Sequence, residues 1–183
     1  MIMKPELHTE RLKLRLIDAS DLGAIHALHV LPETDEYNTL GIPEDIAETR
    51  STITPWILDN QQEVIQQYTF AIEQKADKQF IGLIALKLGN SKYSRGEVWY
   101  KLDVTCWNRG FGTEALRRML NFGFDTLKLH RIEAGCAVDN IGSIKVLEKV
   151  GMTREGRKRK VLPLKSGWSD NFEYAILETD SRG

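Results

Sequence analysis

Two strand-to-helix connections in the second half of the chain narrow the choice of folds more than any other pattern. Residues 97–102 form an apolar strand pattern, and a helix with a broad apolar face begins near Gly110. A second strand pattern covers residues 131–138, and a second helix runs from Asp139 or Asn140 to Gly151. If the two strands are adjacent and parallel, both helices begin at the carboxyl edge of the sheet. In open α/β sheets, ligands bind in the crevice outside the carboxyl ends of the strands.

The rest of the chain predicts a mixed domain with the order β-α-α-β-β-β-α-β-α-β-β. Basic and apolar residues alternate over residues 11–17, as in a half-buried strand. A helix over 18–29 and a loop over 32–43 follow. A further helix from Glu44 to about Asn60 should be kinked or shortened by Pro55. The remaining predicted strands cover residues 68–72, 80–86, 153–161 and 171–177.

Composition excludes several classes of protein. The 183 residues fit one domain over 1–183, and 42% hydrophobic with 28% charged residues is typical of an ordinary globular protein. A net charge of −1 argues against specific DNA binding through overall charge. No apolar run reaches the roughly 20 residues of a membrane span, and Met1–Glu6 lacks the apolar core of a signal peptide. We therefore expect a cytoplasmic protein without a membrane partner.

The sequence predicts no metal site. Two cysteines are too few for a cysteine-based site or a disulfide framework. His26 and His29 are three residues apart on a predicted helix, but no third ligand lies near them in the sequence.

The loop over 107–113 has the features of an anion-binding site. It brings several backbone N–H groups to a helix N-terminus, where they have no intrahelical partner and where the helix dipole favours anions. Gly110 and Gly112 allow close approach of a ligand to the backbone, and Arg109 adds a positive charge. A pyrophosphate fits this pattern, although paired glycines at a helix start are also ordinary turn chemistry. The P-loop spacing is absent, and Ala115 replaces the third glycine of the dinucleotide fingerprint.

The chain resembles a known family along most of its length. The matching motifs are Thr9–Arg15, Phe80–Leu83, Glu97–Leu102, Trp107–Leu116, Leu129–Ala134, Asp139–Met152, Glu155–Gly156 and Gly167–Asp170. These motifs are similar to those of the GNAT N-acetyltransferases, in particular the RimJ/RimL branch that acetylates the N-termini of ribosomal proteins. The resemblance implies an α/β (α+β) fold with a core of about residues 9–177. Its mixed, mostly antiparallel sheet splays between two parallel strands and carries helices on both faces.

The resemblance also implies acetyl-CoA as donor and a set of residues that bind it. The loop that cradles the CoA pyrophosphate falls on Trp107, Asn108, Arg109, Gly110, Phe111, Gly112 and Thr113, with Trp107 replacing the usual Arg or Gln. Backbone groups of Leu102, Asp103 and Val104 would pair with the pantetheine arm. Asn140 would contact CoA, and Ser143 would lie near the thiol. The acetyl group is activated by CoA, so no metal is implied.

The implied mechanism is direct attack of a neutral amine on the thioester. Ser143 is the candidate acid for the departing thiolate, although an ordinary first-turn serine explains it nearly as well. A backbone N–H near Leu102 would stabilise the oxyanion. An α-amine, with an ordinary pKa of about 7.7–8.0, needs no strong base. Glu97 and Asp170 are the candidate bases, each individually more consistent with a structural role.

The sequence is compatible with three hypotheses about the acceptor of the acetyl group. The first hypothesis is the N-terminal α-amine of a protein or peptide, such as a ribosomal protein. The second is a small amine, namely a polyamine, an amino acid or an antibiotic, and the third is a non-catalytic acyl-CoA-binding module. The basic run over 154–160 is either a solvated strand edge or a patch for an acidic surface. Monomer and homodimer are both compatible with the sequence.

Overall fold

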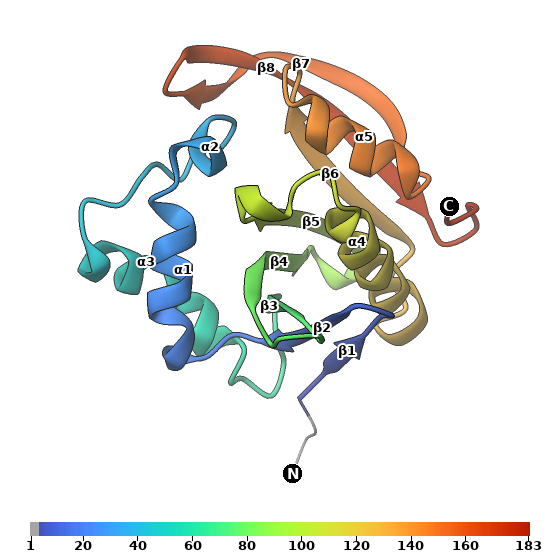
Figure 1. The fold of residues 1–183 in the computed structure, drawn as a ribbon. Coiled ribbons are helices and arrows are strands. Elements are labelled where there is room, and N and C mark those ends of the chain that lie inside the picture. Colours follow the sequence, from blue (N-terminus) through green and yellow to red (C-terminus); the bar gives the residue numbers. More distant parts are fainter. Residues whose placement is uncertain (1–3) are drawn as a thin grey trace.

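An eight-stranded sheet organises the chain (Figure 1). The computed structural model describes residues 4–183, so the first three residues of the Met1–Glu6 segment lie outside the described residues. The strand order is β1-β2-β3-β4-β5-β6-β8-β7, and every neighbouring pair is antiparallel except β5 and β6. The strands are β1 (Glu6–His8), β2 (Leu12–Leu16), β3 (Gln67–Gln74), β4 (Phe80–Leu88), β5 (Arg95–Leu102), β6 (Arg131–Ala137), β7 (Thr153–Leu164) and β8 (Gly167–Leu177).

Helices cover both faces of the sheet, as expected. The α-helices are α1 (Leu22–His29), α2 (Pro32–Asp35), α3 (Ile46–Asp59), α4 (Phe111–Asn121) and α5 (Ile141–Lys149). In Figure 1, α1 and α3 lie on one side of the central strands and α4 on the other. The buried apolar residues accordingly form a large cluster that includes the inner face of α4 and a smaller cluster beneath α1 and α3. The mixed, mostly antiparallel fold is confirmed.

Four elements differ from the sequence prediction. The short strand β1 pairs with β2 ahead of the first predicted strand. The predicted loop over 32–43 contains the helical turn α2, which Pro32 begins because proline suits the first turn of a helix. Helix α3 continues through Pro55 to Asp59, so the proline does not shorten it. The apolar positions of the helix predicted to begin near Gly110 continue to Leu127, but the α-helix ends at Asn121 and a π-helical turn follows at Phe122–Thr126.

The parallel pair β5–β6 is short, and this opens the sheet. Pairing begins at Arg95 with Arg131 and ends at Glu97 with Glu133. Beyond that point β5 continues to Leu102 against β4, whereas β6 follows β8. The two strands therefore diverge toward their carboxyl ends, and helices α4 and α5 begin beyond this divergence.

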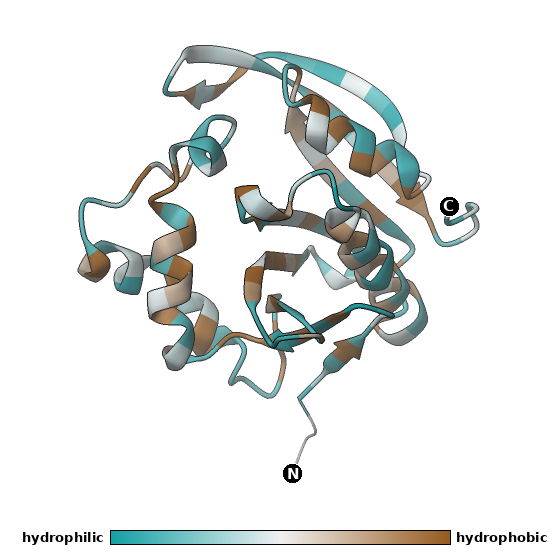
Figure 2. Cartoon of the chain, viewed as in Figure 1, coloured by the Kyte–Doolittle hydropathy of each residue, from teal (hydrophilic) through white to brown (hydrophobic). Residues whose placement is uncertain are grey.

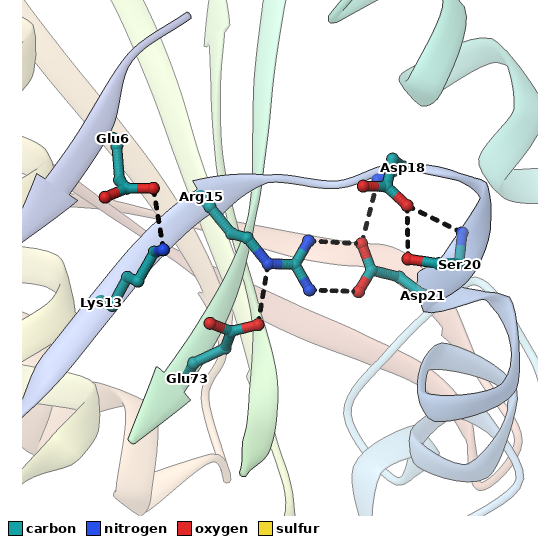
Figure 3. A network of polar contacts seen from close by, with 7 residues as sticks. All are labelled: Glu6, Lys13, Arg15, Asp18, Ser20, Asp21 and Glu73. Atoms are coloured by element: carbon teal, nitrogen blue, oxygen red, sulfur yellow. Dashed lines mark hydrogen bonds and ion pairs between the residues drawn. The ribbon is translucent and has the colours of Figure 1, made fainter. Parts of the chain in front are cut away.

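A polar network fixes the connection from β2 to α1 (Figure 3). The Arg15 guanidinium donates to both carboxylate oxygens of Asp21, at 2.8 and 2.6 Å, and to Glu73 of β3 at 2.7 Å. Asp18 caps the 3-10 turn that leads into α1 by accepting from the Ser20 backbone N–H at 2.8 Å. The network thus holds the start of α1 against two central strands.

The basic run over 154–160 lies on β7, the outer edge strand, which is mostly hydrophilic (Figure 2). Two of its charges have acidic partners on β8. Arg157 pairs with Asp170 at 2.7 Å, and Lys158 pairs with Glu173 at 2.9 Å. These contacts favour the reading of a solvated strand edge, because its charge is partly neutralised within the hairpin.

Candidate active site

A cavity of about 840 Å³ lies where β5 and β6 diverge. The carboxyl ends of both strands, the starts of α4 and α5, and α2 line it. Nine predicted donor-binding residues lie on its wall: Leu102, Trp107, Asn108, Gly110, Phe111, Gly112, Thr113, Asn140 and Ser143. The structure therefore brings the two helix starts to one cavity, as the strand pattern predicts.

Three other predicted donor-binding residues are not part of the cavity wall. The Asp103 carboxylate accepts from the Thr105 backbone N–H at 2.9 Å, which caps the 3-10 turn at Val104–Cys106. Val104 belongs to that turn. The Arg109 guanidinium lies over the ring of Phe111 at 4.9 Å, and its backbone forms part of the loop.

The two candidate bases also lie away from the cavity wall. Glu97 is exposed, in the part of β5 that still pairs with β6. Asp170 is buried in the β7–β8 hairpin, where it accepts from the Lys160 backbone N–H at 2.9 Å and from the Arg157 side chain at 2.7 Å. These two bonds hold the pKa of Asp170 below its ordinary value. A carboxylate held in this way is a poor proton acceptor.

The loop before α4 has the shape of an anion cradle. Gly110 is the N-cap and adopts φ +82°, a left-handed conformation that suits glycine. A Cβ atom on Gly112 would lie 3.2 Å from Leu102 Cδ1 and 3.6 Å from Val146, so a larger residue would fill the cavity. The first backbone N–H groups of α4 have no intrahelical acceptor. The pyrophosphate and pantetheine of acetyl-CoA fit this combination of free amides and open space.

Backbone groups at the end of β5 face the same space. The Asp103 N–H donates to Ile81 of β4 at 2.9 Å. Because successive backbone groups of a strand point to opposite edges, the Leu102 groups point to the crevice. The Leu102 carbonyl accepts from the Trp107 indole at 2.9 Å. Trp107 therefore ties the loop to β5 at the position where the family pattern has Arg or Gln.

Sequence reasoning missed Arg11, which supports this loop from the other end of the chain. Its guanidinium donates to the Arg109 carbonyl at 3.1 Å and lies 4.4 Å from the centre of the Phe111 ring. It also pairs with Glu114 of α4 at 2.6 Å. Burial acts to raise the pKa of Glu114, but hydrogen bonds from Thr9 and Arg11 hold it below its ordinary value. The Thr9–Arg15 motif was visible in the sequence, but its role was not.

A second missed residue is Tyr100 of β5. Its hydroxyl lies 2.8 Å from Ser143 Oγ, so a hydrogen bond spans the gap between β5 and α5. Asn140 caps α5 by accepting from the Ser143 backbone N–H at 3.1 Å. Burial raises the pKa of Tyr100 well above its ordinary value, and it raises that of the neighbouring Cys136 to about 11. Both groups are therefore protonated at neutral pH, and Cys136 is not an activated nucleophile.

Within residues 4–183, no three or more His, Cys, Asp or Glu side chains gather in a way that could hold a metal ion. No helix in the same part of the chain has both the length and the apolar character to cross a membrane.

This chain is similar to one protein family and to several individual proteins. The family described as "Acetyltransferase (GNAT) domain" matches residues 11–153. The uncharacterized N-acetyltransferase YoaA of Bacillus subtilis is 31% identical over 96% of this chain and 98% of its own. The spermidine N(1)-acetyltransferase of Vibrio cholerae is 27% identical over 92% of this chain and 94% of its own.

Solved structures agree with the sequence comparison. A GNAT-family acetyltransferase from Bacillus anthracis superposes with a TM-score of 0.82 at 28% identity, covering 95% of this chain and 99% of that one. RimJ of Mycobacterium smegmatis, solved with CoA-disulfide, superposes with a TM-score of 0.80 at 21% identity and covers 95% of this chain and 88% of that one. The second likeness shows the fold alone.

Proposed function

Because the chain belongs to the GNAT acetyltransferase family and uses acetyl-CoA as its donor, we propose that it acetylates the N-terminal α-amine of a peptide or protein. The family match and the N-acetyltransferase relatives identify an acyltransferase, not a non-catalytic binding module. The observation that carries the proposal is the single cavity that joins both helix starts to the diverging strands.

The donor site is assigned to the loop and to the end of β5. The backbone amides over 110–113 bind the phosphates, with favourable dipole and no Cβ obstruction at Gly110 and Gly112. The Leu102 backbone N–H orients the donor where β5 leaves β6. Acetyl-CoA supplies the acetyl group as a thioester that an amine can attack. Holding the amine beside it can contribute about 7–11 kcal/mol toward the barrier.

We assign Ser143 as the general acid that donates a proton to the departing CoA sulfur. Its hydroxyl is hydrogen-bonded to Tyr100, whose high pKa keeps that phenol protonated and able to replace the proton that Ser143 gives up. Neither Glu97 nor Asp170 reaches the cavity wall, so the proposal assigns no side chain as base. An α-amine, with its ordinary pKa of about 7.7–8.0, provides enough neutral amine by itself.

The shape of the acceptor side supports an extended acceptor. A second, more open cavity of about 380 Å³ lies between the segment over 38–42 and the β7–β8 turn at Pro163–Lys165. Asn38 lines both cavities. The two cavities therefore adjoin at Asn38, and an acceptor that extends from the first cavity into the second suits a chain terminus. The motif resemblance to the RimJ/RimL branch agrees with this assignment.

A polyamine is the second candidate. The spermidine acetyltransferase of Vibrio cholerae matches this chain over nearly its whole length. In addition, Glu33 and Glu36 of the α2 region line the main cavity, and their carboxylates can attract a cation.

An acceptor screen tests the proposal. The protein is incubated with acetyl-CoA and either peptides with free α-amines, the same peptides with blocked α-amines, or spermidine, and products are identified by mass. We expect acetylation of the free peptides only. Preferred acetylation of spermidine would replace the first assignment by the second, and binding of CoA with no product from any amine would refute both.

A further inference from the structure

Lys101 is a buried cation for which the fold provides no partner. The residue is 6% exposed, and its Nζ has no hydrogen-bond acceptor among residues 4–183. It nevertheless lines the main cavity. Burial lowers the pKa of Lys101, while Asp35 acts in the opposite direction. An ammonium buried in this way costs free energy unless something pairs with it.

Lys101 lies on the acceptor side of β5. Alternate residues of a strand share a face, and Trp99, two residues earlier, contacts Trp56 of α3 with ring centroids 5.4 Å apart. Lys101 therefore extends toward the side covered by α1 and α3, while Tyr100 reaches α5 on the donor side. The cation thus sits where the acceptor must approach the donor.

Its nearest charged surroundings do not neutralise it. His29 of α1 is buried, and burial together with the charges of Lys101 and His26 lowers its pKa to about 4, so the ring is neutral at pH 7. Asp35 of α2 is 6% exposed, and one of its carboxylate oxygens has no partner among the described residues. Within residues 4–183, Lys101 and Asp35 are not within ion-pair distance of each other. Two opposite buried charges therefore stay separate at the acceptor end.

We propose that the acceptor carries a carboxylate a few bonds from the reacting amine, and that Lys101 binds this carboxylate. The inference rests on the proposed N-acetyltransferase function and narrows its substrate class. Glu33 and Glu36, which line the main cavity, then face the amine end of the acceptor, so the site matches a molecule with both charges. Asp35 lies between them in the chain and lines the second cavity. A polyamine would bring only positive charge to Lys101, and an uncharged amine would leave the lysine unpaired.

Two kinds of molecule present this chemistry, namely a free amino acid and a peptide with an acidic first residue. Matched pairs separate them. Alanine is compared with alaninamide, and a peptide beginning with Asp is compared with the same peptide beginning with Asn, with spermidine as a further acceptor. In at least one pair we expect the carboxylate to raise kcat/KM by tenfold or more, as one charge-assisted hydrogen bond allows. The pair that responds identifies the source.

The variant Lys101→Met links this preference to the lysine. Methionine keeps most of the side-chain length and removes the unpartnered charge, so we expect an unchanged or higher melting temperature. The selectivity ratio should fall to within twofold of one, while the KM for acetyl-CoA stays constant. Lys87→Met, at an exposed lysine of the neighbouring strand β4, is the control and should keep the wild-type ratio.

Equal rates within both pairs, a preference for spermidine, or a ratio that survives in Lys101→Met would overturn this inference. In each of those cases acetyl transfer still occurs, so the N-acetyltransferase function stands. Failure of every acceptor despite CoA binding would refute the function itself, and the inference with it.

Discussion

The Tyr100 and Ser143 hydroxyls form a pair in which either oxygen can donate. Tyr100 belongs to β5 and Ser143 to the first turn of α5, so their 2.8 Å contact spans the divergence of the sheet. The Asn140 cap fixes the Ser143 backbone, which leaves only the side-chain oxygen to respond to a ligand. A serine that merely filled the first turn would not need a partly buried phenol as partner.

Replacing Ser143 by Ala tests this assignment. We expect kcat to fall by about 10²-fold, a typical contribution of a positioned proton donor, while the affinity for acetyl-CoA stays the same. Tyr100→Phe should give a smaller loss, because Ser143 keeps its hydroxyl. Steady-state kinetics with calorimetric measurement of CoA binding distinguish these effects. An unchanged kcat in Ser143→Ala would show that the sulfur leaves without help from this residue.

At the scale of elements, the regular segments were predictable and their exceptions were not. Strong periodicity located the central strands and the helix that begins near Gly110. The strand β1 has only three residues, too few for a periodic pattern, and it forms because β2 offers a free edge. The sequence predicted the parallel strands, but not that their pairing stops at Glu97. Arg11 was missed for a similar reason, since about a hundred residues separate it from the loop it contacts.

The contact of Arg11 with the loop before α4 leads to a prediction for Arg11→Met. Without the guanidinium, the Arg109 carbonyl and Glu114 lose a shared donor, and the loop is less well ordered for phosphate. We expect the KM for acetyl-CoA to rise by about 5- to 20-fold, the effect of losing one charged hydrogen bond, with kcat at saturation nearly unchanged. Lys13→Met also removes a cation paired with a glutamate, but on β2 away from the loop. It should leave KM as in the wild type.

Considered as a whole molecule, the proposed assignment places the donor and the acceptor on opposite sides of one strand, β5. Tyr100 and Leu102 of β5 point toward α4 and α5. Trp99 and Lys101 point toward the face that α1 and α3 cover. The Arg15 network holds α1 in place over that second face (Figure 3). His29, a buried residue of α1, gives a way to measure the stability of this region.

His29 makes this stability depend on pH. Its pKa is about 4 in the fold and about 6.5 when unfolded, so between these values the unfolded chain binds more protons. The contribution of His29 to the free energy of unfolding is therefore fully present above pH 6.5. It falls as the pH drops toward 4, by an amount on the order of 2–3 kcal/mol. Denaturant unfolding at pH 7, 5.5 and 4.5 should show this decline in the wild type and a smaller one in His29→Leu. Because His8 is exposed, His8→Leu should decline like the wild type. Parallel curves for wild type and His29→Leu would mean that folding does not lower the pKa of His29.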